Sequence, residues 1–210
     1  MLISEQEVID ALTNYNIVVH GVLHIGAHEC EELGFYHKMN IPSSDIIWID
    51  GNKDKVQWAH VHGIPNVYHA LITDTDDKEM DFNITNNGQS SSILDLGTHM
   101  HHHPHVHYIE TRKQQGITID TFFEREQLNA KKYDFWNFDI QGAELLALKG
   151  ATHSLDYPKA IYLEVNSEEL YKGCGLITDI DHYLAVYGFK RVLTKMTEFN
   201  WGDALYVKTN

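Results

Sequence analysis

The chain contains 210 residues, which corresponds to one domain with a single core, since domains usually contain about 100 to 200 residues. Hydrophobic residues make up 43% and charged residues 22% of the sequence, and this composition excludes disordered and fibrous proteins. The 16 Lys and Arg residues against 30 Asp and Glu residues give a net charge of −14, which repels phosphate backbones and argues against a nucleic-acid partner.

The first half of the chain alternates short apolar strands with helices. Ser4 followed by Glu7 forms the capping-box pattern, which predicts a helix within the N-terminal segment 1–16. An apolar strand then ends at Gly26, and two further strands follow, each preceded by a helical segment. In chain order we expect strands at 22–26, 45–50 and 66–71, and helices at 29–39 and 53–62.

The middle of the chain departs from this alternation. Residues 80–85 alternate like a half-exposed strand, whereas residues 86–115 show no clear period and hold six of the 15 histidines. Long irregular loops inside a compact domain are usually functional. We therefore interpret 86–115 as an ordered functional insertion that faces the acceptor substrate.

Regular alternation resumes after this insertion. We expect strands at 133–139, 159–165, 189–194 and 201–208, and helices at 143–155 and 177–187. Strands that alternate with helices form parallel sheets with right-handed crossovers. The sequence therefore predicts one α/β domain over residues 1–210.

The cysteines and the N-terminal segment indicate a compartment. Cys30 and Cys174 are far apart and fit neither a disulfide framework nor a zinc-binding spacing. The apolar run 17–25 is interrupted by two histidines and a glycine, so we expect neither a signal peptide nor a membrane span. These features predict a cytoplasmic protein without a membrane partner.

The first two strands end in residues that suit a nucleotide-like ligand. Such ligands bind at the carboxyl ends of parallel strands, where a glycine turn admits the ligand and an acidic residue about 20 positions later holds ribose hydroxyls. Gly26 and Asp50 are 24 positions apart (50 − 26) and fit these roles. The turn 26–30 has one glycine, whereas dinucleotide sites use three to approach a pyrophosphate. This pattern favours S-adenosylmethionine (SAM), which has no phosphate, over NAD.

Several separated motifs lie between Val22 and Lys208. The most specific is Phe-Asp-Ile-Gln-Gly-Ala-Glu at 138–144, followed by Leu-Lys-Gly-Ala at 148–151. The other motifs are 23–28 with Glu31 and Glu32, 90–94, 118–122, 161–165, 187–189 and 201–204. In this order they resemble the motifs of the FkbM family of SAM-dependent methyltransferases. The chain departs from the family pattern at His24, where many members have Asp, at Cys30, where many have Gly, and at Asp50, where Glu is usual.

The resemblance implies a class I methyltransferase (Rossmann-like) fold, with a seven-stranded, mostly parallel sheet and an antiparallel final strand at 201–208. It also implies methyl transfer from SAM to a hydroxyl, often of a sugar, a glycan or a glycosylated small molecule. The residues that we expect around SAM lie at strand ends and turns: Gly26, His28, Asp50, Asn52, Ala70, Leu71, Asp139 and Ile140.

The catalytic candidates are acidic residues at the ends of two neighbouring strands. Asp139 is the first candidate for the base that takes the hydroxyl proton, or for a group that orients the acceptor; the alternative is a cap on the helix that begins near Gly142. Glu164 ends the following strand, and together with Asp139 and Asn166 it offers oxygen ligands for Mg²⁺. Glu144 lies inside a helix, where we expect a solvated or capping carboxylate.

The six histidines between positions 99 and 107 have three open interpretations. They bind a transition metal, they belong to an exposed polar loop, or they face the substrate, with His103 binding or deprotonating the acceptor hydroxyl. We prefer the third, because similar family members carry histidine and proline after the serine motif. The residues that we expect at the acceptor are Ser91, Ser92, His99, His105 and Tyr171, with Trp201 as a further stacking candidate.

Other functions stay open at this point. Gly26 and Asp50 are compatible with a plain strand end and an exposed turn, and NAD-dependent oxidoreductases use a similar sheet. A non-catalytic metal-binding or interaction protein would use the histidine loop. A nucleic-acid methyltransferase fits less well, because the sequence has no basic aromatic stripe and 137–140 lacks the proline-aromatic motif of amino-methylating enzymes. The sequence does not indicate an oligomeric state.

Overall fold

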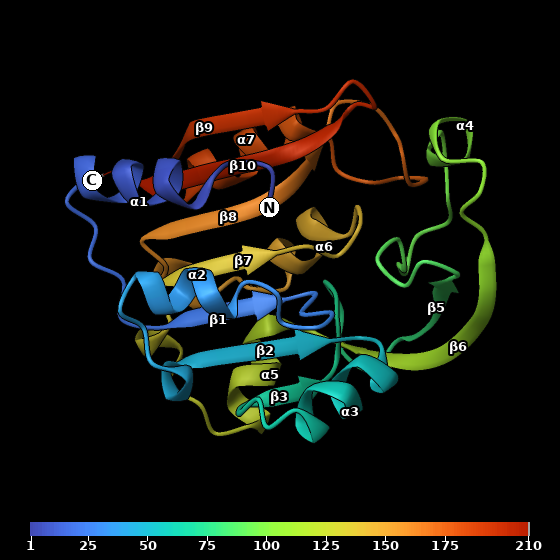
Figure 1. Ribbon diagram of the computed structural model, residues 1–210, viewed down its shortest axis with the longest axis horizontal. Helices are drawn as coiled ribbons and strands as arrows, with labels where there is room; N and C mark the ends of the chain where they lie inside the picture. Colours follow the sequence, from blue (N-terminus) through green and yellow to red (C-terminus); the bar gives the residue numbers. More distant parts are fainter. Residues whose placement is uncertain (210) are drawn as a thin grey trace.

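The computed structural model describes residues 1–209, and its centre is a seven-stranded sheet (Figure 1). Its strands are β1 (Val22–Ile25), β2 (Ile46–Asp50), β3 (Val67–His69), β7 (Phe135–Phe138), β8 (Ala160–Asn166), β9 (Phe189–Met196) and β10 (Trp201–Lys208). Their order across the sheet is β3-β2-β1-β7-β8-β10-β9. Strands β1, β2, β3, β7 and β8 run parallel, and β10 pairs antiparallel with β8 and β9. The predicted mostly parallel sheet with an antiparallel final strand is confirmed.

The strand order reverses its direction at β1, which lies between β2 and β7. From β1 the chain first builds outward to β2 and β3, and it then returns to add β7 and β8 on the other side. Ligands of open α/β sheets bind beyond the carboxyl ends of the strands at such a switch point. The topology therefore places a ligand site beyond Ile25, Asp50 and Phe138.

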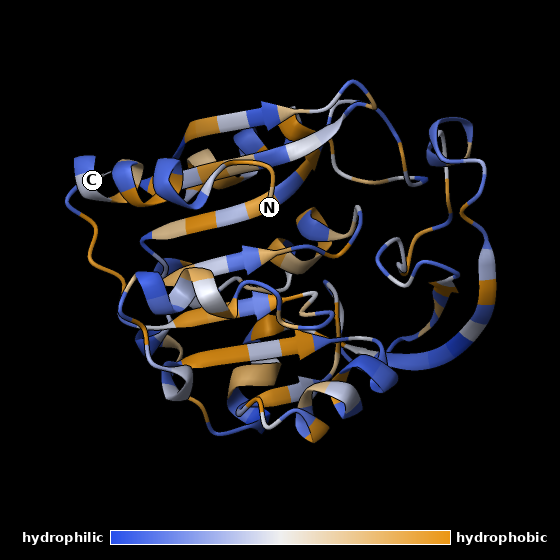
Figure 2. Ribbon diagram, viewed as in Figure 1, coloured by the Kyte–Doolittle hydropathy of each residue, from blue (hydrophilic) through white to orange (hydrophobic). Residues whose placement is uncertain are grey.

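Helices cover both faces of this sheet (Figure 1). One face carries α1 (Glu5–Asn14), α2 (Leu33–Lys38) and α3 (Lys53–Val61), and the other carries α5 (Ile119–Arg125), α6 (Glu144–Lys149) and α7 (Ile177–Val186). Because successive strand residues point to opposite faces, two apolar cores form. Phe35 and Trp48 belong to the first core, and Phe122 and Trp136 belong to the second. Figure 2 shows the apolar residues concentrated on the central strands.

A second sheet extends from the carboxyl edge of the first. It has the order β4-β6-β5 and contains β4 (Leu71–Ile72), β5 (Glu79–Thr85) and β6 (Tyr108–Ile117). Strands β5 and β6 pair antiparallel and form an arm beside the main sheet (Figure 1, right). The prediction of one strand over 66–71 is wrong at its C-terminal end, because Leu71 begins β4, which belongs to a different sheet from β3.

The prediction of an irregular insertion over 86–115 is wrong for its last part, which belongs to the ten-residue strand β6. This strand has no visible period because its polar residues are mostly exposed. Backbone pairing with β5 and ion pairs hold it instead, including Arg112 with Asp54 (2.7 Å) and Lys113 with Glu79 (2.8 Å). A four-residue helix, α4 (His99–His102), lies in the remaining loop.

Other element boundaries also differ from the expected ones. Helix α2 begins at Leu33 and not near 29, because His28 and Cys30 have positive φ angles of 42° and 57°, which interrupt a helix. Helix α6 ends at Lys149, and α5 was not expected. The capping box is present, since Ser4 Oγ accepts the Glu7 N–H (3.3 Å) and the Ser4 N–H donates to the Glu7 carboxylate (3.0 Å).

The helix lengths and the cysteines complete the description of the fold. Within residues 1–209, the helices are all too short or too polar to cross a membrane. Cys30 and Cys174 are both buried and both free.

Candidate active site

A cavity of about 500 Å³ opens at the carboxyl ends of β1, β2, β7 and β8, beneath the loop that follows β5. Its size is in the range of pockets that bind drug-sized ligands and cofactors, about 300 to 1,000 Å³. All eight residues expected around SAM line this cavity: Gly26, His28, Asp50, Asn52, Ala70, Leu71, Asp139 and Ile140. The expected catalytic and acceptor residues Glu164, His103, Ser91, Ser92, His99, His105 and Tyr171 line it as well.

Gly26 makes the turn after β1 possible. Its φ angle is +88°, and a Cβ atom at this position would lie 1.8 Å from the backbone oxygen of Asp139. Only glycine fits such a position, because every other residue would bring a side chain into the neighbouring backbone. The ends of β1 and β7 therefore meet closely, and the backbone of the turn stays open to the cavity.

Asp50 ends β2 and is buried beside this turn, which excludes the exposed-turn interpretation. Its carboxylate accepts the backbone N–H groups of His28 (2.7 Å) and Asn52 (2.6 Å), one on each oxygen. Burial raises the pKa of Asp50, and these hydrogen bonds oppose that effect. Each carboxylate oxygen has about two lone pairs, so both oxygens can accept one more donor from a ligand in the cavity.

A glutamine brings the two catalytic candidates together. The Gln141 Nε2 donates to Asp139 Oδ1 (2.7 Å) and to Glu164 Oε2 (3.0 Å), and its Oε1 accepts the Tyr171 hydroxyl (2.6 Å). Its backbone oxygen accepts the Ser92 hydroxyl (2.8 Å). We call Asp139, Gln141, Glu164 and Tyr171 the glutamine bridge. It joins the ends of β7 and β8 to the histidine loop and fixes how the carboxylates face the cavity.

The carboxylates of the glutamine bridge differ in protonation. Burial raises the pKa of Asp139 to about 6, although the Gln141 hydrogen bond opposes this rise. Burial, together with the negative charges of Asp139 and Glu144, raises the pKa of Glu164 well above its usual value. At neutral pH Asp139 is therefore mostly ionised and can accept a proton, whereas Glu164 holds its proton more strongly than an ordinary glutamate.

Glu144, and not Asp139, is the carboxylate that binds backbone N–H groups next to α6. Glu144 is 1% exposed, so the solvated interpretation is wrong. Its Oε1 accepts the N–H groups of Ile140 (3.0 Å) and Gly142 (3.3 Å) in the turn that precedes α6, and burial raises its pKa to about 8. Asp139 does not cap this helix, because its side chain bonds to Gln141.

The structure gives no support to the Mg²⁺ interpretation. Asn166 does not line the cavity, and its buried side-chain amide has no hydrogen-bond partner in the described part of the chain. The Gln141 amide lies between Asp139 and Glu164, where a shared cation would have to bind. Over residues 1–209 no three His, Cys, Asp or Glu side chains are grouped to hold a metal ion.

The histidine loop divides into residues that face the cavity and residues that do not. His99, His103 and His105 line the cavity, and the His99 ring centroid lies 4.9 Å from that of His103 and 5.4 Å from that of Tyr171. His102 instead contacts Glu168 (2.8 Å) at the loop surface. Burial lowers the pKa of His99 to about 4 and also lowers that of His103, so both rings are neutral at physiological pH.

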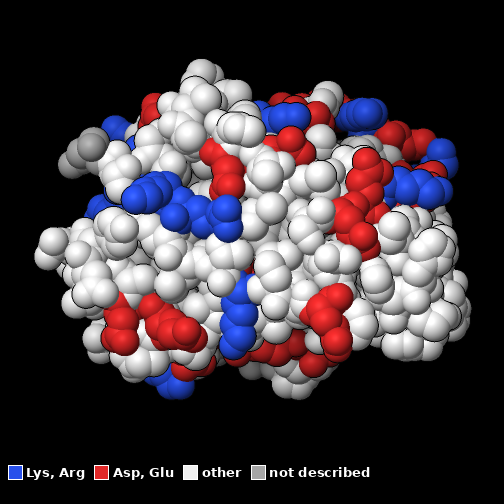
Figure 3. All heavy atoms as spheres, turned by 90° about the horizontal axis from the view of Figure 1, so that it is seen from above, with Lys and Arg blue, Asp and Glu red and all other residues white. Residues whose placement is uncertain are grey.

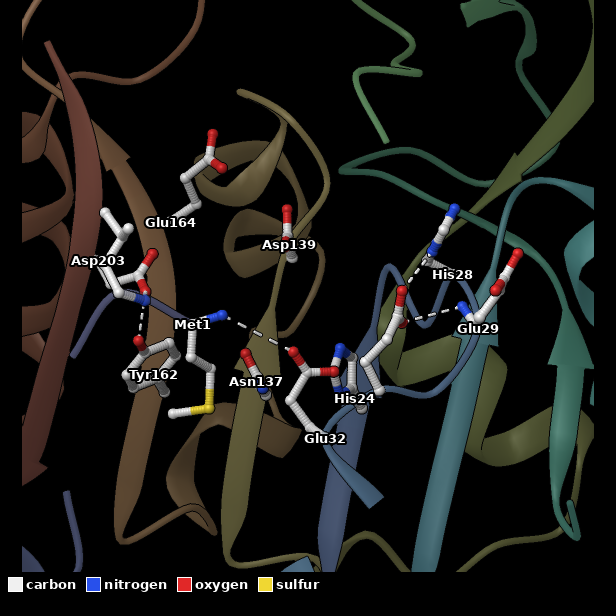
Figure 4. A network of polar contacts seen from close by, with 12 residues as sticks. Met1, His24, His28, Glu29, Glu32, Asn137, Asp139, Tyr162, Glu164 and Asp203 are labelled. Atoms are coloured by element: carbon white, nitrogen blue, oxygen red, sulfur yellow. Dashed lines mark hydrogen bonds and ion pairs between the residues drawn. The ribbon is translucent and has the colours of Figure 1, made fainter. Parts of the chain in front are cut away.

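Sequence reasoning missed several residues that line the cavity. Gln141 is one of them, and Glu32 and Asp203 are two more (the latter two in Figure 4); no role was expected for any of the three. Asp203 lies on β10 directly opposite Glu164, and its carboxylate accepts the Tyr162 hydroxyl. Gln141 and Asp203 belong to motifs noted in the sequence, but only the antiparallel register of β10 shows that Asp203 reaches the site.

His24, which departs from the family pattern, lies below the cavity and is 2% exposed. Its Nδ1 is 2.8 Å from the Tyr36 hydroxyl, which also accepts the Asn137 Nδ2 (2.8 Å). Burial lowers the pKa of His24 to about 3, so the ring is neutral. This departure therefore adds a buried, neutral hydrogen-bonding group and no charge beneath the site.

The chain was compared with known protein sequences and solved structures. No curated protein sequence matches the chain. Similar solved structures include magnesium protoporphyrin IX methyltransferase from Synechocystis with bound SAM, which is 11% identical with a TM-score of 0.46 over 98% of this chain and 78% of that chain. Another is a SAM-dependent methyltransferase from Aquifex aeolicus, 13% identical with a TM-score of 0.38 over 98% and 90% of the two chains.

The assignment of the chain to a protein family rests on its sequence. The profile of the "Methyltransferase FkbM domain" family matches residues 24–191, which contain the glycine turn, Asp50, the histidine loop and the glutamine bridge. The matched range covers most of the 210 residues and ends within β9. The chain therefore belongs to the FkbM methyltransferase family.

Proposed function

We propose that this methyltransferase uses SAM to methylate a hydroxyl group, and that this hydroxyl belongs to a sugar, a glycan or a glycosylated small molecule. The observation that carries the proposal is the shared cavity, which is lined both by Asp50 and the glycine turn and by the ionisable pair of Asp139 and Glu164. A cofactor site and a proton acceptor next to it are what methyl transfer to oxygen requires.

The residues of the cavity fit SAM. The open backbone at Gly26 admits a ligand close to the turn, and the free lone pairs of Asp50 suit the two ribose hydroxyls. Leu71 and Ile140 supply apolar surface for an adenine ring. The single glycine of the turn and the family membership both argue against the NAD-dependent alternative.

The chain's own residues would provide position and proton transfer. Bound SAM supplies an electrophilic methyl group, whose bond to sulfur breaks as the bond to the acceptor oxygen forms. Asp139 takes the proton that the hydroxyl loses, and Glu164, which the Gln141 amide holds beside it, orients the acceptor. Ser91, Ser92 and His103, which also line the cavity, hold the acceptor.

Transfer of labelled methyl groups from SAM to a panel of glycosides tests this proposal. At saturating SAM, Asp139→Asn should lower kcat about 100-fold or more, as expected for loss of a general base. Asp156→Asn changes an exposed residue remote from the cavity and should keep the wild-type rate. Transfer to nitrogen or carbon but to no hydroxyl, or full activity of Asp139→Asn, would contradict the proposal.

A further inference from the structure

The charged side chains that line the cavity are mostly acidic. Lys55 is the only Lys or Arg among the lining residues of the described chain. The carboxylates that line it are Glu31, Glu32, Asp50, Asp139, Glu164 and Asp203. The outer surface differs, since the face in Figure 3 carries separate groups of both signs. The lining of the cavity is therefore acidic in its own right, in addition to the net charge of −14 of the whole chain.

The positively charged groups of the cavity are already paired. Lys55 Nζ lies 2.5 Å from Glu29 Oε1, and His28 Nδ1 lies 2.7 Å from Glu31 Oε1. The ammonium group of Met1, which also lines the cavity, lies 4.0 Å from Glu32 Oε1 (Figure 4). An anionic group on an acceptor would have to compete with Glu29, Glu31 or Glu32 for these cations.

The cavity also offers hydrogen bonds and ring faces. We call His99, His103, Tyr171 and Trp201 the aromatic wall, and all four line the cavity. His99 is 6% exposed, and its Nδ1 has no hydrogen-bond partner among residues 1–209. A buried polar atom without a partner is costly unless a ligand or water satisfies it. Because burial lowers the pKa of His99 and His103, the rings offer neutral donors and acceptors, which suit hydroxyl groups.

We propose that the cavity selects an uncharged polyhydroxyl acceptor and rejects acceptors that carry phosphate or carboxylate beside the reacting hydroxyl. This inference rests on the proposed function and narrows its substrate class. A buried anion needs a paired cation to offset the loss of its hydration, and the aromatic wall supplies none. Neighbouring carboxylates such as Asp139 add repulsion. Sugar hydroxyls and the apolar faces of sugar rings, in contrast, find partners at this wall.

Binding of matched glycosides to the protein saturated with S-adenosylhomocysteine tests the inference. The neutral probe is methyl glucoside, and its anionic counterparts are methyl glucuronide and glucose 6-phosphate, with equivalent sets for galactose and mannose. We expect the neutral member of a set to bind at least tenfold more tightly than its anionic members. Equal or tighter binding of the anionic members would overturn the inference. It would also be overturned if the protein binds S-adenosylhomocysteine but binds none of the glycosides.

A charge introduced at the aromatic wall provides the second arm of the test. His103→Lys places a cation in the cavity, and it should reduce or reverse the preference for neutral glycosides. His101→Lys places the same charge on an exposed residue of the same loop outside the cavity and should leave the preference unchanged. Equal effects of both variants would overturn the inference. Failure of the wild type to bind S-adenosylhomocysteine would instead refute the proposed function, so the two failures are distinguishable.

Discussion

At the scale of single residues, the glutamine bridge determines how Asp139 and the buried Glu164 and Tyr171 share hydrogen bonds. One Gln141 amide donates to Asp139 and Glu164 and accepts from Tyr171. An amide can serve both carboxylates because it carries two N–H donors and no charge. A carboxylate at position 141 would offer acceptors only and would add a third negative charge to the pair.

Gln141→Glu should therefore lower the free energy of unfolding by about 2 kcal/mol at pH 8, the range expected when a buried hydrogen-bonded network is broken. The loss should be smaller at pH 5.5, where the added carboxylate is more easily protonated. Urea unfolding at both pH values measures it. Gln57→Glu is the matched control, because Gln57 is exposed on α3. Equal losses for both variants would show that the bridge contributes nothing to stability.

Glu144 links stability to pH. Burial raises its pKa from 4.5 to about 8, so across this interval the folded chain keeps a proton that the unfolded chain has released. Stability therefore falls as pH rises from about 4.5 to 8, by at most about 1.4 kcal/mol per pH unit for one proton. Glu144→Gln keeps an acceptor for the Ile140 N–H and should flatten this part of the profile. An unchanged slope in urea unfolding would contradict the assignment.

At the scale of elements, the strands and helices that can be predicted from the sequence are those that have a clear apolar pattern. The central strands were predictable because apolar runs such as 46–50 are buried on both faces. Strand β6 was not, because its residues are mostly polar and its partner β5 is what holds it. The start of α2 was missed because the left-handed backbone at His28 and Cys30 depends on tertiary contacts, such as the hydrogen bond from the His28 N–H to Asp50.

The turn between β1 and α2 gives a test at this scale. Gly26→Ala should destabilise the fold by more than about 2 kcal/mol, because the new Cβ would overlap the Asp139 oxygen and the φ angle is positive. Gly34→Ala is the control: this glycine lies in α2 with no atom within 4 Å of a Cβ, so we expect a gain of about 0.4 to 1 kcal/mol. Thermal unfolding measures both, and a Gly26→Ala variant as stable as the wild type would refute the close approach.

At the scale of the whole molecule, the site is assembled from segments that are distant in the sequence. The ends of β1, β2, β7 and β8 meet beyond one edge of the sheet, and the β5–β6 arm brings the histidine loop to the same cavity. The strand-end rule predicted Gly26, Asp50, Asp139 and Glu164 as neighbours. It did not predict Asp203, whose place depends on the antiparallel register of β10.

The central claim is that this cavity binds SAM with Asp50 as the ribose acceptor, and calorimetric titration with SAM and S-adenosylhomocysteine tests it most directly. We expect saturable binding by the wild type and at least tenfold weaker binding by Asp50→Ala, about 1.4 kcal/mol. Asp54→Ala removes an exposed carboxylate at the start of α3 and should bind like the wild type. No binding by the folded wild type, or equal affinity of Asp50→Ala and the wild type, would contradict the claim.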